Sequence, residues 1–583
     1  MKMYIAKIAI IKPLYNLFDY DITDKYNYIE PGCRVLVEFR KKIVVGFVIS
    51  LSFSEKPLNY KLKSIIELID KQPILDNETL NLIKWVANYY HAPLGQVIGI
   101  GTPLYIRQGK KLLEEISENK KIQIIEKKKI KLTEEQNNAV NIIKESLDNY
   151  KCYVLDGVTG SGKTEVYKKI QYLVYTKGLQ TLIIVPEKNL IPELLRYFNS
   201  EKIRAIEYHS SLTPKQKFIN WDLIQKLKID IIIGTRSSVF LQIPKLGLII
   251  VDEEHDLSFK NSSDVKYNAR DISIFRAKKK NIPIILGSAT PSSETTLNIL
   301  KKKYFHIKMR SRVNKQKLPL LKIINMSNKK NEIISNEVIK EIKNQIEKKE
   351  QTLIFLNRRG YSPIIFCKDC MWIPKSNICN LNMTYHKNSN LLMCHYSGES
   401  IKFQNKCHSC NSTNIAFIGE GTEKIEELIK SNFINAKIIR IDSDNMKKKG
   451  KLEEVFSEIK NNKYDIIIGT QMLSKGHNFP NITLVVIMNI DQNLFSPRLK
   501  SIEQLAQQLI QVSGRSGRGN TPGKVIMQTA FPNNEDLNFL IKYGYEKWLS
   551  NLLILRNNLS LPPFKNWGIF EAKSKKKMMQ KYF

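Results

Sequence analysis

One stretch of eight residues, 157–164, constrains the fold of this chain more than any other feature. It reads Gly-Val-Thr-Gly-Ser-Gly-Lys-Thr and fits the pattern G-x-x-x-x-G-K-T. The strand-like run Cys152–Leu155 precedes it and a helical segment follows, as this pattern requires. In such a loop, backbone N–H groups surround phosphates, the lysine neutralises the β- and γ-phosphates and the threonine hydroxyl binds Mg²⁺. We therefore predict an ATP-binding loop formed by Gly157, Val158, Thr159, Gly160, Ser161, Gly162, Lys163 and Thr164.

Buried-type apolar runs recur on both sides of a cysteine-rich segment and alternate with amphipathic segments. The runs are Thr181–Val185, Asp230–Ile233, Leu246–Val251, Pro283–Leu286, Gln351–Leu356, Ala436–Ile441, Asp465–Ile468, Thr483–Met488 and Gly523–Gln528. Near-continuous apolar strands separated by helices indicate parallel sheets that are covered on both faces. We predict an α/β fold with two such domains, the second of which is interrupted by an insertion.

A pair of acidic residues follows one of these runs. The strand Leu248–Val251 leads into Asp252 and Glu253, and the end of such a strand faces the ligand crevice of an open α/β sheet. Asp252 would hold Mg²⁺, and Glu253 would orient or deprotonate the attacking water. The alternative is that both are solvated carboxylates at the start of a helix.

Two further stretches allow two interpretations each. Thr133 and Gln136 form a capping-box pattern that opens the helix before the ATP-binding loop, while Gln136 could also bind adenine through two hydrogen bonds. Spacing alone favours the cap. Arg515 and Arg518 lie three residues apart, and arginines from a second motor domain can stabilise charge on the γ-phosphate. The alternative is a pair of solvated arginines.

Six of the eight cysteines lie between residues 367 and 410. Cys367, Cys370, Cys407 and Cys410 form two C-x-x-C pairs, the spacing of a structural zinc site with four thiolates. Cys379 and Cys394 remain, and the positions that would complete a second site are Ser376 and Ser397, with His386 and His395 nearby. Because serine is a poor zinc ligand, we expect one zinc, and we interpret Cys33 and Cys152 as core residues.

The formal charge is +36 over 583 residues, a length that suggests about four domains. Nucleic acid and anionic membranes are the usual partners of such a charge, although lysines spread along the whole chain account for part of it. No apolar run approaches the ~18 residues of a membrane span, and the first residues form a strand-like run rather than a signal peptide. We expect a cytoplasmic protein that does not bind membranes.

Seven motifs occur in a specific order along the chain: GVTGSGKTEVY (157–167), GTRSSVF (234–240), VDEEHD (251–256), ILGSATPSSET (285–295), FLNRRGY (355–361), GTQMLSKGHNFP (469–480) and QVSGRSGRG (511–519). Together with the cysteine insertion, they resemble the primosomal protein N′ (PriA) family of superfamily 2 helicases, over nearly the whole chain. The resemblance implies that the two α/β domains are RecA-like motor domains (P-loop NTPase) of an ATP-driven 3′→5′ DNA helicase that restarts replication at stalled forks. Its partners would be single-stranded and forked DNA, primosome and helicase-loading proteins and single-stranded-DNA-binding protein.

The resemblance also implies roles for particular residues. It supports adenine binding by Gln136, water activation by Glu253, finger roles for Arg515 and Arg518, and coupling of hydrolysis to motion by Ser288 and Thr290. The N-terminal region would bind the 3′ end of a nascent strand. The expected DNA contacts are Phe18, Asp19, Lys63, Thr235, Arg236, Phe259, Tyr267 and Lys475. For Arg236 and Lys475, plain surface charge is the alternative.

Several positions depart from the family pattern. We expect the linker 107–131 to stand where the family has a winged-helix domain, and we expect residues 546–583 to form only part of the family's C-terminal domain. Val265-Lys266 replaces Trp-Arg in the aromatic loop, Arg40 replaces a glycine, and serines replace two zinc ligands. A fork-binding scaffold with a weak or uncoupled ATPase is therefore the alternative function, and an RNA-directed helicase is a third reading.

We predict the following domain organisation: an N-terminal β-rich DNA 3′-end-binding domain (1–106), a basic linker (107–131), motor domain 1 (132–315), motor domain 2 (316–365 and 414–545), a zinc-binding insertion (366–413) and a truncated C-terminal segment (546–583).

Overall fold

The structure of the chain is a computed structural model. It describes residues 3–23, 26, 28–54, 62–111, 131–313, 319–327, 332–356, 364–386, 389–394, 397–418, 422–442, 446, 450–470, 473, 479, 481–488, 490–517 and 523–568. The chain divides into two compact units, Met1–Pro291 with Lys302–Val313 and Ser292–Lys301 with Asn314–Phe583. Among the helices of the described ranges, none has the length and apolar character that crossing a membrane requires.

The first unit begins with a six-stranded sheet. Its strands are β1 (Met3–Ile10), β2 (Phe18–Asp21), β3 (Arg34–Phe39), β4 (Lys42–Ser54), β5 (Lys63–Ser64) and β6 (Glu67–Leu68), in the order β5-β2-β1-β4-β3-β6. Neighbours pair antiparallel, except that β2 and β5 run parallel. Helices α1 (Asn77–Tyr89), α2 (Leu94–Gly101) and α3 (Leu104–Arg107) follow. The predicted β-rich start of the chain is confirmed.

A buried ion pair joins this N-terminal region to the rest of the first unit. Arg276 on α8 (Ala269–Lys280) donates to the Glu78 carboxylate on α1 over 2.9 Å, and the Arg276 side chain is fully buried. The rings of Trp85 and Phe275 stack with their centroids 3.7 Å apart. Of the predicted linker 107–131, Arg107 is the last residue of α3, and 112–130 lie outside the described residues.

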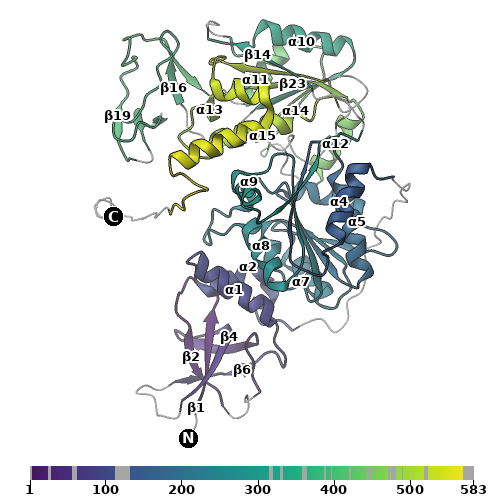
Figure 1. Cartoon of the computed structure of the whole chain (residues 1–583). Helices are drawn as coiled ribbons and strands as arrows, with labels where there is room; N and C mark the ends of the chain where they lie inside the picture. The colour runs from purple at the N-terminus through teal and green to yellow at the C-terminus, as the bar shows by residue number, and fades with distance from the viewer. Residues whose placement is uncertain are drawn as a thin grey trace. The chain divides into compact units, whose positions relative to one another are not determined.

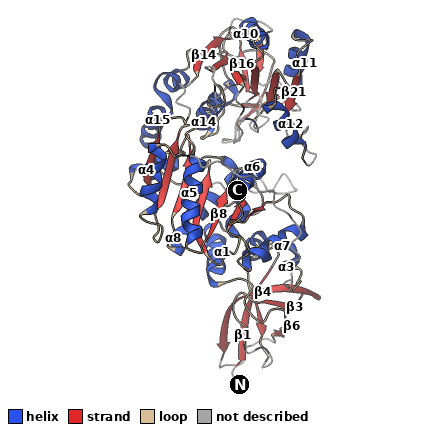
Figure 2. Cartoon of the chain, turned by 90° about the vertical axis from the view of Figure 1, so that its right-hand side faces the viewer, coloured by secondary structure: helices blue, strands red, loops and turns tan. Residues whose placement is uncertain are grey.

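A seven-stranded parallel sheet forms the remainder of the first unit. The strand order is β13 (Phe305–Met309), β7 (Cys152–Gly157), β12 (Ile284–Ser288), β11 (Leu246–Asp252), β8 (Gln180–Ile184), β10 (Ile231–Gly234) and β9 (Ala205–Tyr208). Helices α4 (Glu134–Lys144) and α5 (Lys163–Thr176) lie on one face and α8 on the other (Figure 1). Figure 2 shows α5 running across these strands. The strands that we predicted are confirmed, whereas β9 and β13 were not predicted.

The second unit contains a six-stranded parallel sheet. The strand order is β14 (Leu320–Asn325), β24 (Lys524–Thr529), β23 (Ile482–Met488), β15 (Gln351–Leu356), β22 (Ile466–Gly469) and β21 (Ile438–Ile441). Its helices include α9 (Ser293–Leu300), α10 (Asn336–Glu347), α11 (Thr422–Asn432), α12 (Lys451–Lys460), α14 (Ser501–Ser513) and α15 (Glu535–Asn558). Residues 292–301, which we assigned to motor domain 1, belong to this unit. The boundary that we predicted at residue 545 falls inside α15, whose Trp548 packs in the core.

The cysteine-rich insertion is connected to the rest of the second unit by one pair of antiparallel strands. Strand β16 (Ile364–Cys367) pairs with β20 (Ile415–Ile418), so the insertion begins and ends at the same place. Between them, β17 (Thr384–His386), β18 (Leu391–Met393) and β19 (Ser400–Lys402) form a three-stranded antiparallel sheet. The insertion therefore has a small core of its own, which includes Ile365, Leu392 and Phe403.

Candidate functional site

The predicted ATP-binding loop connects β7 to α5. Gly160 and Gly162 have φ angles of +85° and +78°, a backbone region that glycine enters without strain. Lys163 is the first residue of α5, and its Nζ donates a 2.9 Å hydrogen bond to the Gly157 carbonyl. A Cβ at Gly157 would lie 2.4 Å from Ser161 Oγ, so a larger residue does not fit. The loop has the glycines and the cation that phosphate binding requires.

Backbone contacts hold this loop against the neighbouring strand. Val158 N–H donates to the Met309 carbonyl over 3.0 Å, and Val313 N–H donates to Gly160 over 3.1 Å. Thr159 and Thr164 are half-buried. Ser161 Oγ is buried and finds no hydrogen-bond partner in the described part of the chain. The loop therefore keeps a polar atom that its own fold does not satisfy, which fits a loop that binds a polar ligand.

Asp252 ends β11 at the same edge of the sheet. The Tyr167 hydroxyl donates a 2.8 Å hydrogen bond to Asp252 Oδ1. Burial, reinforced by the Glu253 charge, raises the pKa of Asp252 to about 6, while Lys163 and the Tyr167 hydrogen bond oppose this shift. Since Lys163 acts on Asp252, the cation of the loop and the carboxylate of the strand lie within electrostatic reach of each other.

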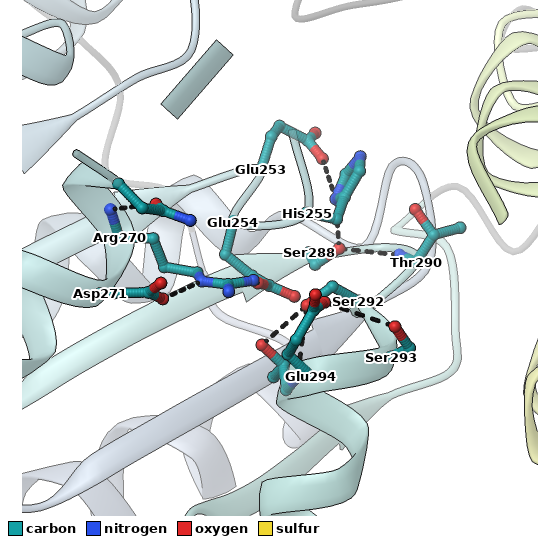
Figure 3. Close-up of polar contacts among 12 residues, drawn as sticks. Glu253, Glu254, His255, Arg270, Asp271, Ser288, Thr290, Ser292, Ser293 and Glu294 are labelled. Atoms are coloured by element: carbon teal, nitrogen blue, oxygen red, sulfur yellow. Dashed lines mark hydrogen bonds and ion pairs between the residues drawn. The ribbon is translucent and has the colours of Figure 1, made fainter. Parts of the chain in front are cut away.

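A chain of polar contacts leads from Glu253 to the strand beside it (Figure 3). Glu253 has a φ of +51°, and its Oε2 lies 3.7 Å from His255 Nδ1. His255 Nδ1 shares a 2.7 Å hydrogen bond with Ser288 Oγ, which also accepts a 2.9 Å bond from the Thr290 N–H. The contacts join the acidic strand end to the two residues for which we predicted a coupling role. Sequence reasoning gave His255 no role, although it stands in the VDEEHD motif.

Gln136 lies at the start of α4, where the predicted capping box is present. Thr133 Oγ1 accepts from the Gln136 N–H, and Gln136 Oε1 accepts from the Thr133 N–H. Gln136 Nε2 donates to the Ser161 carbonyl over 2.9 Å. Both ends of the amide are thus engaged within the protein, and adenine binding by Gln136 stays a prediction.

Two of the predicted DNA contacts line a cavity of about 530 Å³ in the first unit. Thr235 and Arg236 belong to its wall, and Arg236 Nη1 donates to the Ser258 carbonyl over 3.3 Å. Arg107 and Lys188 also line it, together with one carboxylate, Asp264. Sequence reasoning missed both of these cations, because Arg107 comes from the N-terminal helices and only the fold brings it here.

The predicted aromatic DNA contacts lie inside the first unit. Phe259 is 1% exposed and Tyr267 2% exposed, and the Tyr267 ring packs edge-on against Phe240. Val265, between them in the same loop, is 1% exposed. A side chain must be exposed to stack on a base. In this conformation the two rings therefore contribute to the core, and their DNA contact remains a prediction.

The predicted contacts of the N-terminal sheet lie on neighbouring strands. Phe18 packs edge-on against Phe39 with ring centroids 4.9 Å apart, and Arg40 lies 5.4 Å from the Phe39 ring centroid. Lys63 pairs with Glu38 over 2.8 Å at the surface. Asp19 is half-buried and stands opposite Lys7 in the strand register. Phe18 and Arg40 therefore contact the same ring.

The four cysteines of the C-x-x-C pairs meet in the insertion. The Sγ atoms of Cys367, Cys370, Cys407 and Cys410 all lie within 4.8 Å of one another. Cys367 Sγ is 3.6 Å from Cys410 Sγ, and Cys370 Sγ is 3.5 Å from Cys407 Sγ. The backbone N–H of Trp372 lowers the pKa of Cys370 to about 7. Four converging thiols fit a tetrahedral zinc ion.

The predicted arginine finger is described in part. Arg515 lies two residues after the end of α14 and is 4% exposed. Arg518, Lys475 and His395 lie outside the described residues. The roles predicted for them remain predictions.

Three family models match the chain. They are a 3′ DNA-binding domain at residues 7–103, a DEAD/DEAH box helicase domain at 133–299 and a helicase conserved C-terminal domain at 399–520. The two helicase models imply the use of a nucleotide and Mg²⁺.

Curated relatives match over most of the chain. The replication restart protein PriA of Haemophilus influenzae is 33% identical over 649 residues, which cover 98% of this chain and 88% of that protein. The same protein of Rickettsia felis is 36% identical over 571 residues, covering 96% of this chain and 86% of that protein. The solved structure of RecG bound to a three-way DNA junction aligns with a TM-score of 0.45 at 17% identity, covering 74% of this chain and 50% of that one.

Proposed function

The chain belongs to the PriA family of replication restart proteins, and on this premise we propose that it is an ATP-dependent 3′→5′ DNA helicase acting at stalled or branched forks. The observation that carries the proposal is the meeting of the ATP-binding loop with the acidic strand end. The Tyr167 hydroxyl of α5 donates to the Asp252 carboxylate, and the Lys163 charge opposes the rise that burial causes in the pKa of Asp252. A nucleotide triphosphate needs a cation and a carboxylate at one sheet edge.

Each residue at this edge has a proposed role. Lys163 binds the β- and γ-phosphates, and the oxygens of Thr164 and Asp252 are the hard donors that suit Mg²⁺. When bound, Mg²⁺ neutralises charge that develops on the phosphates. Glu253 orients the attacking water. Gln136 would bind adenine by releasing Ser161, and Arg515 and Arg518 would stabilise charge from the second motor domain.

The contacts of Glu253 suggest how ATP hydrolysis is coupled to movement of the segment around Ser288 and Thr290. His255 bridges Glu253 and Ser288, and Ser288 holds the Thr290 N–H. A shift of Glu253 on loss of the γ-phosphate would therefore move Thr290. Only glycine fits at position 287, because a Cβ there would lie 1.6 Å from the Tyr167 hydroxyl.

Single-stranded DNA is proposed to pass along the cavity lined by Arg107, Lys188 and Arg236. Its cations would bind phosphates, which carry most of the affinity in sequence-independent binding. Forked DNA and the proteins that load the replicative helicase are proposed partners, by membership of the family. The four-cysteine site would hold a structural zinc.

The test is ATP hydrolysis with and without single-stranded DNA. We expect DNA to stimulate hydrolysis, Lys163→Ala to abolish it, and Lys169→Ala, an exposed lysine of the same helix, to leave it unchanged. Hydrolysis that RNA stimulates more than DNA would contradict the proposal and favour an RNA-directed helicase.

One observation favours the alternative of a fork-binding scaffold. Phe259, Val265 and Tyr267, which lie in the loop expected to sense DNA, are buried. Slow hydrolysis indifferent to DNA, together with tight binding of forked DNA, would support the scaffold and contradict the helicase.

A further inference from the structure

The cysteine-rich insertion contains four turns with the same backbone form. In each, the N–H of the first residue donates to the carbonyl five residues later, over 2.8–2.9 Å: Cys367 to Trp372, Ser376 to Leu381, Cys394 to Glu399 and Cys407 to Ser412. The N–H of the fifth residue donates back to the first carbonyl, and that residue has a positive φ: Met371 (+60°), Asn380 (+54°), Gly398 (+73°) and Asn411 (+57°). All four turns therefore share the backbone form of the turns that hold the four-thiol site.

Two of these turns form the four-thiol site, and the other two face each other in the same way. Their first and fourth residues are Ser376 with Cys379 and Cys394 with Ser397. Cys379 Sγ lies 3.4 Å from Cys394 Sγ, and Ser376 Oγ lies 3.1 Å from Ser397 Oγ. These separations resemble the 3.5 and 3.6 Å of the four-thiol site. The second pair of turns therefore repeats the first, with two hydroxyls in place of two thiols.

The donor set does not suit zinc. Structural zinc sites take thiolates and imidazoles, and a serine hydroxyl does not ionise near neutral pH. His386 lies on β17. Within the described ranges, the four-thiol site is the one group of three or more potential ligand side chains that lies close enough to share an ion.

A carboxylate connects the two turns instead. Glu399, the last residue of the third turn, accepts a 2.5 Å hydrogen bond from Ser376 Oγ. It also accepts bonds from the Asn377 N–H at 2.9 Å, Asn377 Nδ2 at 3.3 Å and the Ile378 N–H at 3.5 Å. The Ser376 hydrogen bond is the main cause that lowers the pKa of Glu399. One carboxylate of the Cys394–Glu399 turn thus accepts hydrogen bonds from three residues of the Ser376–Leu381 turn, and it joins the two turns as a metal would.

We propose that the second pair of turns binds no zinc and is closed by the Glu399 carboxylate, so that the chain holds one zinc and Cys379 and Cys394 ligate no metal. The backbone keeps the form of a zinc site, so restoring two thiols restores the site. The proposal rests on the insertion alone and does not depend on the proposed helicase activity.

The first test is the zinc content of the purified full-length chain, measured by elemental analysis after a weak chelator removes loosely bound metal. We expect one zinc per wild-type chain and two in the double variant Ser376→Cys/Ser397→Cys. The matched control Cys379→Ser/Cys394→Ser should keep one zinc. Two zincs in the wild type, or one in a folded Ser376→Cys/Ser397→Cys variant, would overturn the proposal.

A second test uses thiol reactivity. Cys370, Cys379 and Cys410 are all exposed, so exposure alone would let iodoacetamide alkylate each of them. In the native zinc-loaded protein we expect alkylation of Cys379 and protection of Cys370 and Cys410, because zinc-bound thiolates are shielded. Protection of Cys379 to the same degree would contradict the proposal.

A third test asks whether the Glu399 carboxylate joins the two turns, which we call the Glu399 clamp, or whether its removal only disturbs the local structure. Glu399→Ala should speed amide hydrogen exchange at Asn377 and Ile378, which lose their acceptor. In the Ser376→Cys/Ser397→Cys background with zinc, the same substitution should leave this exchange slow, because the metal joins the turns. Equal acceleration in both backgrounds would show that Glu399 does not do the work of a metal.

Discussion

Arg556 Nη1 donates a 2.9 Å hydrogen bond to Glu503 Oε2, and both side chains are 3% exposed. The same nitrogen donates to Ser293 Oγ over 2.9 Å, and Ser293 donates its N–H to the other Glu503 oxygen. One buried ion pair therefore ties α9 to α14 and α15 within the second unit. α9 begins three residues after Thr290, so this network holds the segment that follows the coupling motif.

We predict that Glu503→Ala destabilises the protein by about 3–5 kcal/mol, the usual cost of removing one partner of a buried ion pair. The loss leaves the Arg556 guanidinium buried without a counter-charge. Urea unfolding followed by circular dichroism measures the change. Lys322→Ala, which breaks the exposed pair between Lys322 and Glu337, is the control and should cost no more than about 1 kcal/mol.

Removing the charge of Asp252 should stabilise the metal-free protein. Burial raises the pKa of this carboxyl from 3.8 to about 6, so the folded state binds its proton more tightly than the unfolded chain does. Its contribution to stability is present below the unfolded pKa and is lost as pH rises through about 6. Asp252→Asn should therefore gain about 1–3 kcal/mol near pH 8 in the presence of a chelator, and abolish ATP hydrolysis.

The pH dependence of the stability gained by Asp252→Asn is the control for this prediction. Urea unfolding of Asp252→Asn and wild type should give stabilities that converge as pH falls from about 6 toward 3.8, because below the unfolded pKa the wild-type carboxyl is protonated in both states. A gain that is equal across this pH range would contradict the assignment to ionisation of Asp252.

Arg236→Ala should weaken binding of single-stranded DNA without unfolding the protein. Its guanidinium lines the cavity, and one phosphate contact contributes about one unit to the salt dependence of binding. Fluorescence anisotropy at several salt concentrations measures both affinity and slope. An unchanged slope would indicate that Arg236 does not contact a phosphate.

Phe259→Ala should lower the stability of the protein and leave its affinity for DNA unchanged. The ring is 1% exposed, and truncating a buried phenylalanine typically costs about 3–5 kcal/mol. DNA affinity, measured on the folded fraction at low temperature, should stay near the wild-type value. A loss of affinity with unchanged stability would mean that the loop opens and the ring stacks on a base.

The fold was predictable where strands are fully buried and failed at three edge strands, although the edge strand β21 was predicted. Every residue of β8 and β10 is buried, and each strand contains an unbroken run of three apolar residues. The edge strands β9, β13 and β14 are partly exposed, as Phe305 and Leu320 show at 48% and 79%. An edge strand needs one buried face, so its sequence carries a weaker pattern.

The residues of the candidate site were predictable where they follow from local spacing, and their contacts were not predictable where they depend on tertiary structure. Lys163 and Asp252 were predictable because local spacing places Lys163 at the start of the helix that follows β7 and Asp252 at the end of β11. The link from His255 to Ser288 joins residues 33 apart, and the Glu399 clamp joins turns more than 20 apart, so neither follows from spacing. The burial of Phe259 and Tyr267 also depends on tertiary packing against residues such as Phe240.

Arg40, which departs from the family pattern noted above, lies in a left-handed turn. Arg40 and Lys41 have φ angles of +48° and +63° and form the two-residue turn between Phe39 and Lys42, which are partners in the β3–β4 register. The left-handed conformation costs a non-glycine residue about 1–2 kcal/mol. Lys41→Gly should therefore stabilise the protein by up to about 1 kcal/mol in urea unfolding. Arg40→Gly should gain less, because it removes the cation–π contact with Phe39. Lys42→Gly, at the start of β4, is the control and should lose about 0.5–1 kcal/mol, as glycine does inside a strand. A loss of stability in Lys41→Gly would contradict a left-handed turn at this hairpin.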